Sequence, residues 1–366
     1  MRMLHVEVCS LKDLDRSVWD REMSDQSYST YAQTSYFADF REAVSDYTES
    51  IFIRVKKGEK GVGWLLMLKQ FPYELVLDRA GRLKKLFSVS AKLLQTYSWP
   101  SGPLYSGSEN AREVFNSLLD TVDSLARQSG IYMVRQILPA YLPADPGWKE
   151  LDEVFVSHGY ESRPKATVIL KVRDMKVDHL WERLKKDTRR AVRKARNQRV
   201  SVVEATTEKE VDAYYNIRKE TARRNRLRFP SREYFQAILR SFPRDVYKIF
   251  LSEHEGHWVS GQGVAVFNGN LILEGVCYSD YSKENSIYGN DLVQWHIIEW
   301  ACSQGANMVD WVGYFTQPQT KHEEGINSYK LKWGGEVVEY PEYFKVFSPV
   351  KFRLVDLARR VFSGGN

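Results

Sequence analysis

NDLVQWHIIEWACSQGANMVDWVGYF, residues 290–315, predicts an apolar helix that ends near Gly305 and leads into a strand. Glycine is favoured directly after a helix because it adopts the left-handed C-cap conformation without strain. The same order occurs earlier, where LLDTVDSLARQSG (118–130) predicts a helix and IYMVRQIL (131–138) a strand. The helix ends LARQSG and WACSQG share a small residue, polar residues and a final glycine, which indicates a duplication.

A helix and a hairpin precede each copy of this unit. In the first half, SYFADFREAV (35–44) predicts a helix with Phe37 and Phe40 on one face, and IFIRV and GWLLMLKQF (51–55 and 63–71) predict strands around the turn KKGEKG. In the second half, EYFQAILRSF (233–242) and VYKIFLSEHEGHWVSGQGVAVF (246–267) give the same helix, strand, turn and strand. We therefore predict two similar α/β domains with mixed sheets, related by duplication.

Chain length agrees with a duplication, because 366 residues suit two domains of roughly 150 to 200 residues each. Prolines and turn residues accumulate between PAYLPADPGW (139–148) and RPK (163–165), where we expect the boundary. The predicted ranges are an N-terminal domain over 1–160, a C-terminal domain over 161–346 and a C-terminal amphipathic helix over 347–366.

Composition argues against several classes of protein. Hydrophobic residues make up 43% of the chain and aromatic residues 13%, which is enough to form cores and excludes a disordered chain. The three cysteines, Cys9, Cys277 and Cys302, are scattered, and neither they nor the seven histidines have the spacing of metal ligands. HEGH (254–257) lies where a turn is expected. No signal peptide and no run of about 18 apolar residues is found, so we expect a cytoplasmic protein.

Positive charge is concentrated in KKDTRRAVRKARNQR (185–199), which holds eight basic side chains and one acid. A helical wheel predicts one amphipathic helix over 180–196, with Leu180, Leu184, Ala191 and Ala195 in one stripe. The opposite face carries the candidate RNA- or phosphate-binding residues Lys186, Arg189, Arg190, Arg193 and Arg196, together with Lys185. Like charges one turn apart repel by a few tenths of a kcal/mol, which favours a polyanionic partner over a merely solvated face.

A second basic cluster, RKETARRNRLRF (218–229), places six basic residues beside Glu220. Arginine predominates in it, which favours bidentate phosphate contacts. No zinc finger, leucine zipper or RNP-type motif accompanies the two clusters. We therefore expect them to contact the phosphates of RNA or of a nucleotide-linked substrate.

Four motifs follow one another over nearly the whole chain. YSWPSGPLY (97–105) looks like the pattern Y-x-P-x-G-P with one more residue after the tyrosine, and DTRRAVRKARNQRVSV (187–202) looks like R-R-x-I-R-K-A with valine in place of isoleucine. The third motif is a helix with the pattern L-x-Q-W-x-x-I, then a small residue and Gly, then a strand with Asp; here these are Leu292, Gln294, Trp295 and Ile298, then Ala301 and Gly305, then Asp310. The fourth is the ending F-K-x-x-F-G-G, which corresponds to Tyr329, Lys330, Trp333, Gly334 and Gly335. The chain thereby resembles the FemABX family, the tRNA-dependent peptidoglycan aminoacyltransferases and their relatives, which are built from two tandem GNAT-like domains.

One departure from that family pattern concerns the strand Asp. Family members often carry Asp-x-Gly-Gly at this point, whereas this chain has Asp310, Trp311, Val312 and Gly313.

The resemblance implies transfer of an amino acid from aminoacyl-tRNA to an amine of a nucleotide- or lipid-linked cell-envelope precursor peptide of the peptidoglycan type, without a cofactor. It makes Lys330 the catalytic cation near the tRNA terminus, the alternative being an ordinary exposed strand residue. Asp310 would act as general base or orient the amine, or else cap a turn. Gly334 and Gly335 are expected to form a turn or bulge, with Trp333 in the core.

The other candidate substrate-binding residues are of two kinds. Arg224 and Arg228 would hold substrate phosphates. Tyr278, Tyr288 and Tyr329 would line the cleft, although aromatic residues in such positions are more often part of a core.

Two rival functions stay open. The first is an acyl-CoA-dependent GNAT-type N-acyltransferase acting on a cell-surface polysaccharide or other amine. It normally needs a glycine-rich pyrophosphate loop before a helix, whereas KKGEKGVG (56–63) lies between strands and Asp291 would repel a phosphate. The second is a non-catalytic RNA-binding protein. The basic C-terminal helix either packs on the second domain or contacts an anionic membrane surface peripherally.

Overall fold

The computed structural model describes residues 3–71, 94–107, 110–137, 147–227 and 229–363, and the chain forms two compact units. Unit 1 consists of Met1–Pro164 with Tyr340–Asn366, and unit 2 of Lys165–Glu339. This division differs from the predicted ranges, which placed residues 340–346 in the C-terminal domain. The reason is strand pairing, because Glu342–Val346 run antiparallel to Met133–Ile137 of unit 1.

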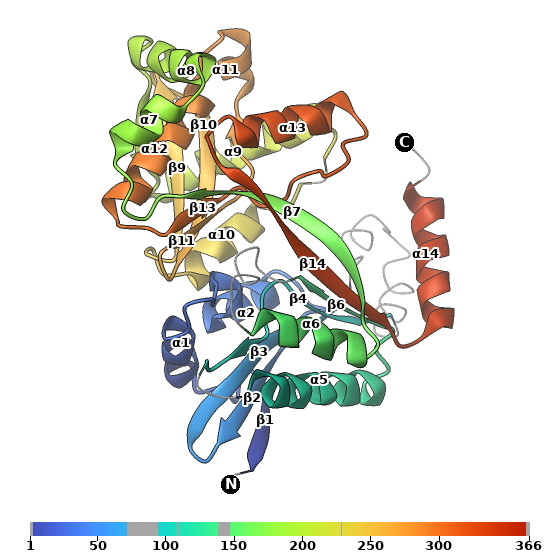
Figure 1. The fold of residues 1–366 in the computed structure, drawn as a ribbon. Helices are drawn as coiled ribbons and strands as arrows, with labels where there is room; N and C mark the ends of the chain where they lie inside the picture. Colours follow the sequence, from blue (N-terminus) through green and yellow to red (C-terminus); the bar gives the residue numbers. More distant parts are fainter. Residues whose placement is uncertain (1–2, 72–93, 108–109, 138–146, 228, 364–366) are drawn as a thin grey trace. The chain divides into compact units, whose positions relative to one another are not determined.

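Unit 1 is built on a mixed sheet with the strand order β1-β2-β3-β4-β6-β14 (Figure 1). Its strands are β1 (Leu4–Ser10), β2 (Glu49–Lys57), β3 (Lys60–Gln70), β4 (Thr96–Trp99), β5 (Leu104–Tyr105), β6 (Met133–Ile137) and β14 (Glu336–Val346). The short strand β5 lies off this order and pairs with β3. The pair β4 and β6 is parallel, and the other neighbours in this order are antiparallel. The predicted hairpin is therefore present as β2 and β3.

The helices of unit 1 are α1 (Arg16–Ser24), the short 3-10 helix η1 (Tyr31–Gln33), α2 (Ser35–Ala43), α5 (Ala111–Gln128), α6 (Trp148–Ser157) and α14 (Pro349–Ser363). Helix α5 crosses over from β4 to β6, as a parallel strand pair requires. It buries a stripe of apolar side chains one turn apart, from Val114 through Leu118 and Val122 to Ala126, against the sheet. It ends before Gly130, whose φ of +62° confirms the predicted glycine stop.

Unit 2 repeats this plan, with the strand order β7-β13-β11-β10-β9-β8. Its strands are β7 (Glu161–Lys171), β8 (Ser201–Glu204), β9 (Tyr247–His254), β10 (His257–Phe267), β11 (Asn270–Leu273), β12 (Cys277–Tyr278) and β13 (Met308–Asp310). The short strand β12 lies off this order and pairs with β10. Here β11 and β13 are the parallel pair. The HEGH segment forms the turn between β9 and β10, as predicted.

The helices of unit 2 are α7 (Val177–Arg183), α8 (Lys186–Asn197), α9 (Glu208–Arg224), α10 (Arg232–Ser241), α11 (Asp280–Glu284), α12 (Gly289–Ser303) and α13 (Lys321–Leu331). Helix α12 is the counterpart of α5, because it too precedes the second strand of a parallel pair and ends before a glycine, Gly305, with φ of +64°. Both units thus combine an antiparallel hairpin with a helix-linked parallel pair, which confirms the predicted mixed-sheet fold class.

The predicted single helix over 180–196 is wrong. Leu184 has extended backbone (φ −65°, ψ 144°) and separates α7 from α8. The break changes which side chains face inward, because Thr188, Val192 and Ala195 of α8 are buried while Ala191 is only half-buried. Leu180, Leu184, Val192 and Ala195 all join one core, so the break does not separate the apolar stripe that the wheel predicts for Leu180, Leu184 and Ala195.

The strand predicted over 307–315 is shorter than expected, since β13 ends at Asp310 and a loop follows it. This loop shapes the candidate site. Among the described residues, no helix is both long enough and apolar enough to span a bilayer.

Candidate functional site

Lys330 lies in the last turn of α13 and not on a strand, so the alternative of an exposed strand residue is wrong. The helix begins at a capping box in which the hydroxyl of Thr320 accepts a hydrogen bond from the Glu323 amide. At the other end, the Lys330 Nζ donates to the carbonyl oxygens of Val312 at 2.6 Å and Gly313 at 2.5 Å. Two of the three ammonium protons are thereby used for positioning, and the third has no hydrogen-bond partner among the described residues.

The loop that supplies these carbonyls has unusual backbone geometry. Val312 has φ of +44° and Gly313 φ of +78°. Positive φ is a strained conformation for a β-branched residue, and it occurs where the family pattern has glycine. Strain of this kind persists where surrounding contacts hold it, and here both carbonyl oxygens are held by Lys330. Val312 replaces a glycine of the Asp-x-Gly-Gly pattern, and it still adopts a positive φ, which glycine adopts without strain.

Asp310 ends β13 and is 7% exposed. Its Oδ1 accepts hydrogen bonds from the Thr167 hydroxyl at 2.5 Å and from the Val312 amide at 2.8 Å. Burial raises the pKa of Asp310, while these two hydrogen bonds and the charge of Lys330 act in the opposite direction. Asp310 therefore both fixes the loop and supplies a carboxylate that is more basic than an exposed one.

Lys330 and Asp310 influence each other electrostatically without forming a salt bridge within the described structure. Burial lowers the pKa of Lys330 to about 8, and the Asp310 carboxylate opposes this shift. At neutral pH the amine is still mostly protonated, since its pKa lies above 7. The pair thus places a cation and a partly desolvated carboxylate around one loop, as proton transfer and charge stabilisation require.

Tyr329 and Trp333, the two aromatic residues of the same motif, pack edge to face with ring centroids 6.1 Å apart. Lys332 lies over both rings, and its Nζ donates to the buried carboxylate of Asp291. Gly334, with φ of +84°, turns the chain directly after Trp333, which confirms the predicted glycine turn and core tryptophan.

A hydrogen bond joins α12 to the residue after β13: the Trp311 Nε1 donates to the Gln294 Oε1 at 3.1 Å. The Gln294 Nε2, which is also buried, has no hydrogen-bond partner in the described part of the chain, whereas the Tyr329 hydroxyl and the Trp333 side chain are polar neighbours without a well-formed hydrogen bond. Buried polar atoms without a protein partner are uncommon in folded proteins.

Comparison with known proteins agrees with this arrangement of motifs. Residues 155–255 match the model of the FemAB family. The matched segment contains Thr167 and the basic helix α8, but neither Asp310 nor Lys330. A comparison with curated protein sequences gives no match.

Solved structures share the fold of this chain over nearly its whole length. The fold is similar to the crystal structure of FemX, with a TM-score of 0.76 and 14% identity over 95% of this chain and 99% of that chain. A tandem GNAT protein from the clavulanic acid biosynthesis pathway matches with a TM-score of 0.57 and 12% identity over 95% and 99% of the two chains. L-PGS from Bacillus licheniformis matches with a TM-score of 0.56 and 11% identity over 94% and 96%. The resemblance to the FemABX family and to tandem GNAT-like folds is thereby confirmed.

Helix α8, within the FemAB segment, presents the predicted cationic face. Lys186, Arg190 and Arg193 are exposed, Arg189 is half-buried, and none of the four forms a salt bridge within the described residues. Arg196 differs from them, because it pairs with Glu299 at 3.0 Å. Arg193 and Arg196 also lie 5.5 and 5.8 Å from the centroid of the Trp181 ring, which orients them along the helix.

Arg224 is engaged in contacts within unit 2. Its guanidinium pairs with Asp280, donates to the Tyr278 carbonyl and lies 4.3 Å from the centroid of the Tyr278 ring. Tyr288, at the start of α12, is covered by the Lys194 ammonium at 4.4 Å. No hydrogen bond, ion pair or ring contact between described residues joins these side chains to Lys330. Arg228 lies outside the described residues.

Sequence reasoning missed Thr167 and the Asp291–Lys332 pair. Thr167 precedes Asp310 by more than a hundred positions, so no local pattern connects them. The Asp291 carboxylate does stand in the first turn of α12, as expected, but Lys332 neutralises it. Its repulsion of a phosphate is therefore weaker than the sequence suggests.

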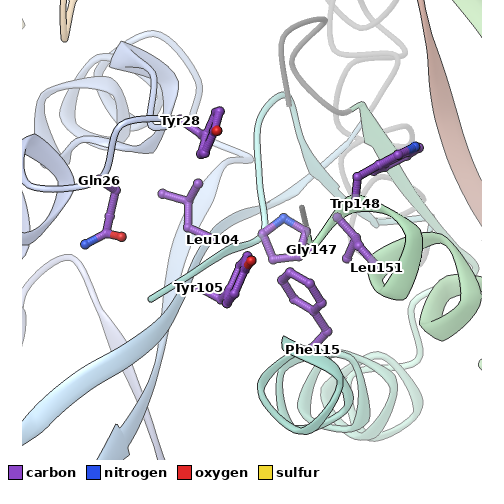
Figure 2. A pocket seen from close by; sticks show the side chains of 9 residues that line it. Gln26, Tyr28, Leu104, Tyr105, Phe115, Gly147, Trp148 and Leu151 are labelled. Atoms are coloured by element: carbon purple, nitrogen blue, oxygen red, sulfur yellow. The ribbon is translucent and has the colours of Figure 1, made fainter. Parts of the chain in front are cut away.

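A small apolar pocket lies in unit 1, where the motif YSWPSGPLY contributes Pro103, Leu104 and Tyr105 to its wall. Figure 2 shows Tyr105 next to Phe115, with ring centroids 5.1 Å apart, and Trp148 and Leu151 on another side. A Cβ at Gly147 would lie 2.4 Å from the Tyr105 hydroxyl, so a larger residue there would displace the Tyr105 ring. The motif therefore has a packing role here, and the pocket contains no carboxylate or amine.

Proposed function

We propose that this protein is an aminoacyltransferase that moves an amino acid from aminoacyl-tRNA to an amine of a peptidoglycan-type precursor peptide. The observation that carries the proposal is the position of Lys330, a partly buried ammonium fixed by two carbonyl oxygens beside the buried Asp310. The FemAB match, the FemX-like fold and the basic face of α8 support it.

The reaction needs orientation and charge stabilisation more than covalent catalysis. An amine attacks the ester carbonyl, negative charge develops on oxygen, and the ribose hydroxyl leaves as the acyl–oxygen bond breaks. The third N–H of Lys330 would donate a hydrogen bond to the developing oxyanion, and Asp310 would accept a proton from the attacking amine and pass it to the leaving ribose oxygen. The strained loop at Val312 would hold the ammonium at a fixed position during these steps.

A pH–rate profile tests the role of Lys330. Because the protonated amine is the active form and its pKa is about 8, kcat/KM is expected to fall as pH rises through about 8. The measurement is transfer from charged tRNA between pH 6 and roughly 9.5, corrected for spontaneous ester hydrolysis. Lys330→Arg should move the falling limb to higher pH, since arginine stays protonated throughout. A wild-type profile without a falling limb contradicts this role.

A tRNA-binding titration tests the basic face. The double variant Lys186→Ala with Arg190→Ala removes two exposed cations one helical turn apart. We expect weaker binding and a log–log salt slope that is shallower by about 2. Lys12→Ala with Arg21→Ala in unit 1 removes the same charge from exposed positions elsewhere and serves as the control. Equal loss in both variants would mean that only net charge matters, and the assignment of α8 would be wrong.

Two measurements distinguish the proposed aminoacyltransferase from the two rival functions: which ligand the protein binds, and whether it transfers an amino acid to a precursor. Calorimetry with acetyl-CoA, run beside filter binding of charged tRNA, distinguishes the acyl-CoA-dependent N-acyltransferase, which would bind the first and not the second. A non-catalytic RNA-binding protein would bind tRNA but show no transfer to a nucleotide- or lipid-linked precursor. Salt-sensitive tRNA binding with transfer, and without acetyl-CoA heat, is the result expected here.

A further inference from the structure

Helix α14 carries an uncovered apolar stripe. Val350, Leu354 and Leu357 are 70%, 58% and 62% exposed, and their spacing places them on one face. The other side of the helix is fixed to unit 1, because Val355 is buried and the Lys351 Nζ donates to the Gly130 carbonyl at 2.9 Å. The helix, labelled α14 in Figure 1, therefore presents three large apolar side chains to solvent from an anchored position.

Positive charge borders this stripe. Arg353 lies between Val350 and Leu354 in the sequence, is exposed, and forms no salt bridge with the described residues. Over residues 349–363 the sequence has four basic residues and one acidic residue, Asp356, so the segment carries a net positive charge. An apolar stripe with cations at its edge matches the surface of an anionic bilayer, where apolar side chains enter the acyl boundary and cations contact headgroup phosphates.

A second copy of the chain is a poorer partner for this face. A two-fold interface would place the same helix of the partner opposite α14. Two segments of the same net positive charge would then meet, and this repulsion disfavours such an interface. Anionic lipid satisfies both the stripe and the charge.

We propose that α14 docks this protein peripherally on an anionic lipid surface, with Val350, Leu354 and Leu357 in the acyl boundary and Arg353 at the headgroups. The proposal rests on this helix alone and not on aminoacyl transfer. The surface would bring unit 1 close to any lipid-linked substrate.

Vesicle flotation of the full chain tests the proposal, with vesicles of phosphatidylglycerol and phosphatidylcholine against vesicles of phosphatidylcholine alone. Wild-type protein should float with the anionic vesicles and much less with the neutral ones. Leu354→Asp should weaken binding about tenfold or more, because it places a charge where a leucine would enter the acyl boundary. Arg353→Gln should weaken it about fivefold, the expected effect of one cation near an anionic surface.

Val156→Asp is the matched control, since Val156 is 60% exposed on helix α6 of the same unit and should bind like wild type. Binding of tRNA should be unchanged in Leu354→Asp, which separates failure here from failure of the proposed reaction. Equal flotation of Leu354→Asp and wild type overturns the proposal. So does a wild-type dimer, seen by light scattering, that Leu354→Asp dissociates while anionic vesicles bind neither protein.

Discussion

Lys330→Ala is expected to lower kcat/KM for aminoacyl transfer by roughly 100- to 1,000-fold, the usual effect of removing one preorganised donor to a developing oxyanion. The alanine variant loses the only charge that the Val312 and Gly313 carbonyl oxygens hold in place within the described structure. It also removes the cation that faces Asp310. Single-turnover transfer from charged tRNA, with the acceptor in excess, isolates the chemical step from product release.

Lys321→Ala is the matched control for this variant. Lys321 is the first residue of the same helix and is exposed, so its removal changes net charge equally while leaving the loop intact. It should retain nearly wild-type activity. tRNA affinity should be similar in both variants if Lys330 acts mainly in the transition state. If Lys330→Ala transferred at the wild-type rate, the proposed chemistry of this site would be refuted.

Trp333→Ala is expected to destabilise the protein by about 3 to 5 kcal/mol, the usual cost of deleting a buried tryptophan. Trp333 is 1% exposed and belongs to the core of unit 2, together with Trp311 and Trp295. Its loss would also remove the edge-to-face contact with Tyr329, next to Lys330. Denaturant unfolding followed by circular dichroism and by fluorescence measures the change in the free energy of unfolding.

Trp333→Phe separates volume from the indole N–H. The Trp333 Nε1 makes no well-formed hydrogen bond with the described residues, although the Tyr329 hydroxyl is a polar neighbour, so its loss should cost less than the loss of the ring volume. We expect phenylalanine to recover most of the stability that alanine loses, because much of the apolar volume is restored. A cost below about 1 kcal/mol for Trp333→Ala would not fit a core position.

The local elements could be predicted because their signals are short-range. The hairpin turns at KKGEKG and HEGH, the two helices that end before Gly130 and Gly305, and the glycine turn after Trp333 all appear where the sequence predicts them. Each depends on the conformational preferences of a few adjacent residues. The duplication followed from these signals, because it is a repeated order of elements.

The break between α7 and α8 could not be predicted in the same way. Residues 180–196 contain no proline or glycine, and their apolar spacing fits a continuous helix. At Leu184 the backbone is nonetheless extended, although Leu180, Leu184, Val192 and Ala195 all pack into one core. No residue type in this stretch marks the break, so only the structure reveals it.

The sequence by itself determined the fold class, the duplication and the chemical types at the candidate site, namely the lysine of the F-K-x-x-F-G-G ending and the aspartate after the last crossover helix. Only the tertiary structure decided that Thr167 binds Asp310, that Arg224 is paired with Asp280, and that residues 340–346 complete the sheet of unit 1. Periodicity and turn preferences act over a few residues, whereas these contacts join segments far apart in the chain. Which distant partners meet depends on strand pairing and on burial of the whole core.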